Sequence, residues 1–166
     1  RIAMKVCIVG IGLIGGSLAI DLKRRGFASV IIGVDSNKHH QNIALHSGLV
    51  DKIDTLENAV KKSDFIILST PVSANREMLP EILTMIDGTN KVVTDMGSTK
   101  AGIAQAVIMH PNRGRYVASH PMAGTEFSGP MAAIGKLFDY KHVIICDKDL
   151  SDEDAIRTVV AMYIIL

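Results

Sequence analysis

Residues 5–19 read Lys5-Val6-Cys7-Ile8-Val9-Gly10-Ile11-Gly12-Leu13-Ile14-Gly15-Gly16-Ser17-Leu18-Ala19. The unbroken apolar run before Gly10 is typical of a strand covered on both faces, and apolar residues at helical spacing follow Gly15. Between them, the pattern Gly10-x-Gly12-x-x-Gly15 predicts a turn that binds a dinucleotide, with Gly10 for the tight turn, Gly12 for close approach of a pyrophosphate and Gly15 for close packing of the helix. We therefore expect cofactor contacts from Gly10, Ile11, Gly12, Leu13, Ile14 and Gly15, where free helix N–H groups face the phosphates.

An acidic residue ends the next apolar segment, residues 29–35. Asp35 follows Gly15 by 20 residues, the spacing at which a dinucleotide fold places an acceptor for the ribose hydroxyls. Its negative charge would repel the 2′-phosphate of NADP, so the sequence predicts NAD, although Lys38 nearby would favour the phosphate. The alternative is a glycine-rich turn in an unrelated α/β protein.

Further apolar strands are expected at 64–68, 91–95, 115–119 and 142–146, and helical segments separate them. This alternation predicts an α/β fold, a doubly wound and mostly parallel Rossmann-type sheet with helices on both faces, in one domain spanning residues 1–166. Residues 51–54 are interpreted as a connection. Pro71 is expected at the first position of a helix over about 73–86, and Ser151 is expected to cap the last helix.

The composition points to small-molecule or protein partners. The net charge is +1, with 18 basic and 17 acidic residues spread along the chain, which gives no basic surface for nucleic acid or an anionic membrane. Cys7 and Cys146 lie in apolar runs without metal-ligand spacing, so we expect buried thiols and no metal site. His39, His40 and His46 are interpreted as a solvated helix face. With no signal peptide and no apolar run of about 18 residues, a cytoplasmic location is expected.

Polar residues follow three of the predicted strands. Ligands of doubly wound sheets bind beyond the carboxyl ends of the strands, so we expect cofactor contacts from Asp95 and, after the strand at 64–68, from Ser69, Thr70 and Pro71. Ser98 is either a helix cap or a substrate contact. His120 follows the strand at 115–119, where Pro121 favours extended backbone, and it is the candidate general base; the alternative is a structural loop histidine.

Four motifs together resemble the prephenate/arogenate dehydrogenase family of tyrosine biosynthesis, over nearly all 166 residues. They are Gly10-x-Gly12-x-x-Gly15-Gly16-Ser17, Thr70-Pro71-Val72, Asp95-x-Gly97-Ser98-x-Lys100 and His120-Pro121-Met122-Ala123-Gly124-x-Glu126-x-Ser128-Gly129. The first two occur in many nucleotide-dependent enzymes. The last, at this distance after the third, is the most specific.

The resemblance implies an NAD-dependent oxidative decarboxylation of prephenate to 4-hydroxyphenylpyruvate. It gives His120 the role of base, with Ser98 beside it and the substrate hydroxyl. Gly124, Thr125 and Glu126 would belong to a loop that controls access to the site. It also implies a homodimer formed through a second, largely helical domain that lies outside these residues, so these 166 residues alone are expected to bind NAD with little or no turnover.

Three alternatives stay open at this point. The substrate could be arogenate, because the groups that would meet the side chain's keto or amino end are not identifiable. The chain could be another hydroxyacid-type dehydrogenase, since that class shares the glycine turn and a strand-exit loop with serine and lysine. It could also be a non-catalytic nucleotide-sensing module.

Overall fold

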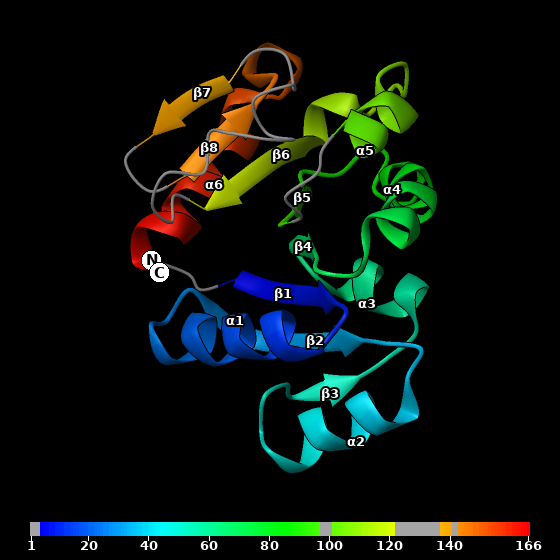
Figure 1. Ribbon diagram of the computed structural model, residues 1–166, viewed down its shortest axis with the longest axis vertical. Helices are drawn as coiled ribbons and strands as arrows, with labels where there is room; N and C mark the ends of the chain where they lie inside the picture. The colour runs from blue at the N-terminus through cyan, green and yellow to red at the C-terminus, as the bar shows by residue number, and fades with distance from the viewer. Residues whose placement is uncertain (1–3, 97–100, 122–136, 141–142) are drawn as a thin grey trace.

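A single sheet runs through the molecule, from β3 at one end to β7 at the other (Figure 1). The computed structural model describes residues 4–96, 101–121, 137–140 and 143–166. Within these ranges the sheet has eight strands in the order β3-β2-β1-β4-β5-β6-β8-β7. The strands are β1 Met4–Val9, β2 Ala28–Val34, β3 Lys52–Ile53, β4 Phe65–Leu68, β5 Val92–Asp95, β6 Tyr116–Pro121, β7 Leu137–Tyr140 and β8 Val143–Cys146.

Helices connect most of the parallel strands. They are α1 Leu13–Arg24, α2 Lys38–His46, α3 Leu56–Lys62, α4 Val72–Met85, α5 Ala101–Val107 and α6 Glu153–Ile165, with 3-10 turns η1 Arg113–Arg115 and η3 Lys148–Leu150. Local sequence explains several ends: Asn37 Oδ1 accepts hydrogen bonds from His39 N and His40 N and so caps α2, while Thr55 caps α3.

The strand order reverses at β1. From β1 the chain proceeds outward through β2 and β3, then returns to place β4 on the other side of β1 and continues through β5 and β6. All of these pairs are parallel, so the carboxyl ends of the strands lie at one edge of the sheet. This is the doubly wound, mostly parallel fold that the sequence predicts, and its ligand crevice is expected between the ends of β1 and β4.

Two apolar layers cover the two faces of the sheet. On one face α1 and α6 pack against residues such as Ile8, Ile31 and Val117. On the other face α3, α4 and α5 pack against residues that include Ile66 and Val93. Because both faces are covered, the central strands are apolar without alternation, as in the fully buried FIIL sequence of β4.

Four sequence expectations need correction. Residues 52–53 form a short strand, β3, paired with β2, and β7 was not expected at all; β8 runs antiparallel to both β6 and β7. Pro71 precedes α4 as its N-cap instead of occupying its first position. Ser151 does not cap α6: its hydroxyl donates to the Tyr116 carbonyl oxygen, and Asp152 holds the cap position.

Cys7 and Cys146 are both buried, as predicted. Burial raises the pKa of the Cys7 thiol to about 12, so this group stays protonated and inert at neutral pH.

Among the described residues, no cluster of three or more His, Cys, Asp or Glu side chains could hold a metal ion. No helix in those ranges is both long and apolar enough to cross a membrane.

Buried polar groups join β5, β6 and α6. The Tyr116 hydroxyl donates to Asp95 Oδ1 at 2.5 Å, and both residues are fully buried. Separately, the Ser119 hydroxyl lies 2.8 Å from Thr94 Oγ1 and 3.0 Å from the Tyr163 hydroxyl. Burial, followed by the neighbouring Asp95 charge, raises the pKa of Tyr116, so it remains a donor.

We predict that Tyr116→Phe lowers the free energy of unfolding by about 1–3 kcal/mol, because it leaves a buried carboxylate oxygen without this donor. Tyr163→Phe is the matched control: it removes one hydrogen bond between neutral groups and should cost about 0.5–1.5 kcal/mol. Urea denaturation followed by circular dichroism measures both. A loss from Tyr116→Phe no larger than that from Tyr163→Phe would contradict the assigned contact.

Candidate functional site at the carboxyl edge of the sheet

The glycine turn connects β1 to α1 at the reversal of strand order. Gly10 adopts φ +89°, a conformation that side chains other than glycine rarely tolerate, and its N–H donates to the Val34 carbonyl oxygen at 2.7 Å. Gly12 is the N-cap of α1, and no side chain caps the helix there. The first turn of α1, which starts with Leu13 and Ile14, therefore offers its N–H groups to an external acceptor.

Gly15 brings α1 against the turn. A Cβ atom at this position would collide with the Gly10 carbonyl oxygen and would stand 2.8 Å from Ser69 Oγ. Only a residue without a side chain permits this approach. The packing role that the sequence predicts for Gly15 is thus visible in the structure.

The residues that follow β4 lie against the same turn. The Ser69 hydroxyl is placed 2.5 Å from the Gly10 carbonyl oxygen and 2.9 Å from that of Val9. Thr70 is in contact with Gly10 as well: its Cγ2 is 2.7 Å from the position of a Cβ on that glycine. Its hydroxyl donates to Oδ1 of the buried Asn75 at the start of α4. Pro71 is exposed at the same exit. The structure therefore brings Ser69 and Thr70 to the glycine turn.

Asp35 follows β2 and lies beside the turn. Its Oδ2 accepts from Ile11 N at 3.0 Å, and its Oδ1 accepts from Asn37 N at 2.8 Å. Burial by itself would raise the pKa of Asp35, but these hydrogen bonds and one from His40 outweigh it and hold the pKa below its ordinary value. At neutral pH this side chain is therefore an anion.

His40 is the site residue that the sequence interpretation missed. Its Nδ1 lies 3.1 Å from Asp35 Oδ2, so it belongs to the Asp35 cluster and not to a purely solvated helix face. The available signal was the cap: because Asn37 caps α2, the side chain three residues later points back toward the helix start.

Asp95, a predicted cofactor contact, is the last residue of β5. Asp95 and Val93 share the face of the sheet that α5 covers, and the fully buried Asp95 side chain accepts a hydrogen bond from the Tyr116 hydroxyl. Met96 N donates to the Leu68 carbonyl oxygen at 3.1 Å, which ties the exit of β5 to that of β4.

His120 lies inside β6, where it pairs with Ile144 of β8. Its backbone is extended, as the sequence predicts, and its side chain is half-buried at the same edge of the sheet as the glycine turn. Ser98, Gly124, Thr125 and Glu126 lie outside the described residues.

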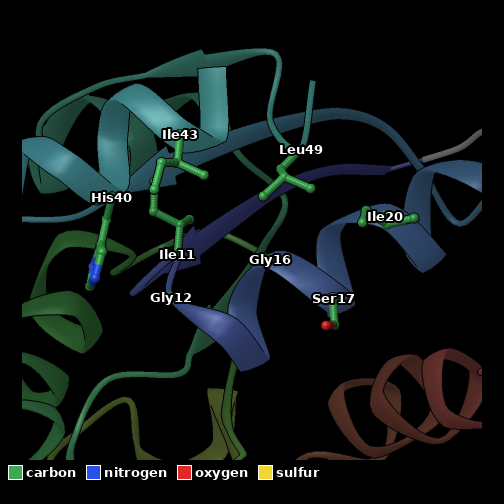
Figure 2. Close-up of a pocket in the computed structure, with 8 residues that line it drawn as sticks. All are labelled: Ile11, Gly12, Gly16, Ser17, Ile20, His40, Ile43 and Leu49. Carbon is green, nitrogen blue, oxygen red and sulfur yellow. The ribbon is translucent and has the colours of Figure 1, made fainter. Parts of the chain in front are cut away.

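A pocket of about 340 Å³ lies next to this edge, between α1 and α2. Figure 2 shows Ile11, Ile43 and Leu49 along it, with the His40 ring at the end near Gly12. Most of its lining is apolar. None of the described residues at the exits of β4, β5 and β6 lines it, and it meets the site through Ile11, Gly12 and His40.

The fold and the glycine turn define a nucleotide-binding α/β domain. Residues 18–164 match the family described as "Prephenate dehydrogenase, nucleotide-binding domain". The chain is 32% identical over 164 residues to the prephenate dehydrogenase of Lactococcus lactis, covering 98% of this chain and 46% of that protein. It therefore belongs to the prephenate dehydrogenase family and represents its nucleotide-binding domain, and it spans about half the length of this relative.

Solved structures agree with this assignment. Two crystal structures of the prephenate dehydrogenase of Aquifex aeolicus superpose with TM-scores of 0.75 and 0.72 at 30% and 27% identity, covering 96% and 99% of this chain and 58% of theirs. The second is a complex with hydroxyphenyl propionate and NAD+. The arogenate dehydrogenase of Synechocystis has a TM-score of 0.70 at 26% identity, covering 96% of this chain and 55% of its own.

The close approach at Gly15 can be tested by adding one methyl group. We predict that Gly15→Ala lowers the free energy of unfolding by about 1–3 kcal/mol, since the methyl group meets backbone that cannot retreat. Gly16→Ala is the control: it gains the same helix propensity, and its Cβ meets only the Leu49 side chain, 3.1 Å away. Thermal unfolding measures both, and equal stability of the two variants would contradict the assigned packing.

Proposed function

We propose that this chain is the cofactor-binding part of an NAD-dependent enzyme that oxidatively decarboxylates prephenate to 4-hydroxyphenylpyruvate, a step of tyrosine biosynthesis. The observation that carries the proposal is the shared edge of the sheet. There the glycine turn after β1, braced by Ser69 after β4, lies on the same side as His120 at the end of β6. The family membership supports the same activity.

The residues of the turn fit a dinucleotide. The uncapped start of α1, together with Gly10 and Gly12, leaves an open backbone surface where a pyrophosphate would accept hydrogen bonds. Asp35 would hold the ribose hydroxyls, and Ser69, Thr70 and Pro71 would border the crevice. When bound, NAD supplies the acceptor for the substrate's hydride.

Asp35 supports NAD over NADP. Its lowered pKa keeps the carboxylate charged at neutral pH, so it can accept hydrogen bonds from ribose hydroxyls and would repel a 2′-phosphate. The complex of the Aquifex relative with NAD+ is consistent with this choice.

In the proposed reaction His120 is the base. A neutral imidazole at the end of β6 would accept the proton of the substrate hydroxyl while the carbon that bears this hydroxyl gives up its hydride to NAD. Carbon dioxide would leave as the substrate ring becomes aromatic. Ser98 is proposed beside this hydroxyl, and Gly124, Thr125 and Glu126 in the segment that controls access. For Asp95 we propose an indirect role, holding the exit of β5 through its contact with Tyr116.

Arogenate remains the second candidate substrate, and the similarity to the Synechocystis arogenate dehydrogenase favours keeping it. A dimer of the intact protein and a cytoplasmic location remain predictions from the sequence. A steady-state assay of the intact protein with prephenate and with arogenate, each with NAD and NADP, tests the proposal. Lack of hydride transfer in all four combinations would support the sensing module instead.

We expect Asp35→Ala to weaken NAD binding by about 1–3 kcal/mol, because the variant loses charged acceptors for the ribose. Asp21→Ala is the control, since Asp21 makes an exposed ion pair with Arg24 on α1 away from the turn. Isothermal titration calorimetry measures both. Wild-type affinity in Asp35→Ala would remove Asp35 from the cofactor site.

We predict that His120→Asn lowers kcat of the intact enzyme by roughly 10²–10⁴-fold. NAD affinity should hardly change, because β6 lies three strand spacings, roughly 14 Å, from β1 and its glycine turn. In the wild type, kcat should fall toward acid pH as the imidazole is protonated, and this limb should vanish in the variant. His110→Asn, in the connection before β6, is the control. Near-normal turnover with an unchanged acid limb would make His120 structural.

A further inference from the structure

His40 lies on the carboxylate that the proposed function assigns to the cofactor ribose. Its Nδ1 is 3.1 Å from Asp35 Oδ2, and its Cε1 is 3.8 Å from the position that a Cβ on Gly12 would occupy. The ring therefore stands between Asp35 and Gly12, the N-cap residue of α1, with 43% of its side chain exposed. Figure 2 shows the ring extending from α2 toward this turn.

The first turn of α2 holds the ring in this place. Asn37 Oδ1 accepts from the backbone N–H of His40, and the Gln41 side chain donates to the Asp35 carbonyl oxygen at 2.5 Å. The contact between His40 and Asp35 thus comes from the cap geometry and not from a flexible side chain reaching across the surface.

The hydrogen-bond partners of the Asp35 carboxylate determine which nitrogen of the neutral His40 ring carries the hydrogen. An ionised carboxylate only accepts, at about four lone-pair positions. Three of these have partners: Asn37 N on Oδ1, and Ile11 N and His40 Nδ1 on Oδ2. Nδ1 must therefore donate, so Nε2 of the neutral ring is an acceptor, whereas the protonated ring donates from both nitrogens and carries a positive charge.

Among the residues that the structure describes, few charges other than Asp35 face His40. The seven other described residues that line the pocket it shares with α1 have no ionisable side chain. Ser69, Thr70 and Pro71 after β4 have none either. On its own helix Lys38 and His39 are neighbours in sequence, and both are exposed. Among the described residues, Asp35 is the charged group in contact with the ring.

We propose that His40 is a specificity residue whose protonation state decides how strictly the Asp35 site excludes a cofactor with a 2′-phosphate. The neutral ring leaves the Asp35 charge uncompensated and turns an acceptor outward, so a phosphate is repelled. The protonated ring compensates that charge and offers a donor, so a phosphate is tolerated. This inference rests on the proposed function, because it assumes that the cofactor ribose binds at Asp35.

The test is binding, not activity. Dissociation constants of NAD and NADP are measured by calorimetry on the intact protein at about pH 8 and about pH 5.5, on either side of the histidine range, at fixed ionic strength. In the wild type, the ratio Kd(NADP)/Kd(NAD) should fall about tenfold from the higher to the lower pH. The 2′-phosphate itself titrates near pH 6, so variants are needed to isolate the histidine.

Two variants isolate the ring, and a third is the control. His40→Gln should show only the smaller pH effect of the phosphate. His40→Lys should already show at pH 8 the low ratio that the wild type reaches at pH 5.5, because lysine is charged throughout. His39→Gln, one position earlier on the same helix, should behave like the wild type.

The outcomes separate the two proposals. A wild-type pH dependence in His40→Gln, or an unchanged ratio at pH 8 in His40→Lys, overturns the role of His40 while leaving the cofactor site intact. If the wild type binds neither cofactor at either pH, the proposed function itself fails. Binding of both cofactors with the expected ratios in all four proteins supports the inference.

Discussion

The contact between the glycine turn and the exit of β4 is the constraint on which the site depends. Ser69 donates to the carbonyl oxygen of Gly10, and the absence of a side chain at Gly15 lets α1 press on the same peptide. Together they fix the two strand ends on either side of the reversal in strand order, where the sheet offers a crevice. The start of α1, Asp35 and the exit of β4 all take their relative positions from this small cluster.

Much of the fold could be predicted because its determinants are local. Apolar runs without alternation mark buried parallel strands, and Gly10, Gly15 and Asp35 mark the turn by spacing alone. What the sequence did not reveal depends on distant partners. Two residues of β3 carry no periodic signal and become a strand only through pairing with β2. Ser151 looks like a cap, but tertiary contact with Tyr116 takes its hydroxyl.

The predictions for the site divide in the same way, into those that local sequence determines and those that depend on distant partners. Sequence placed Ser69 and Thr70 at a strand exit, and the structure brings both to the turn. It could not show that Asp95 faces the α5 side, because which face a strand residue takes depends on register. The histidine itself also gave no sign that it contacts Asp35, because no sequence pattern distinguishes it from other histidines on a polar helix face. The one sequence signal for this contact was the position of Asn37 as the N-cap of α2.

The two-residue length of β3 has a further consequence for the isolated molecule. Open edges of sheets are templates for pairing with a second chain, and a long, flat, apolar edge invites aggregation. Here the β2 side of the sheet ends in a strand of only two residues, one of them the exposed Lys52. Because β3 is short, an incoming strand would find few backbone groups to pair with. Pairing there would also remove water from the charged Lys52 side chain, which costs free energy. β3 itself is therefore a poor template for strand pairing at this end of the sheet.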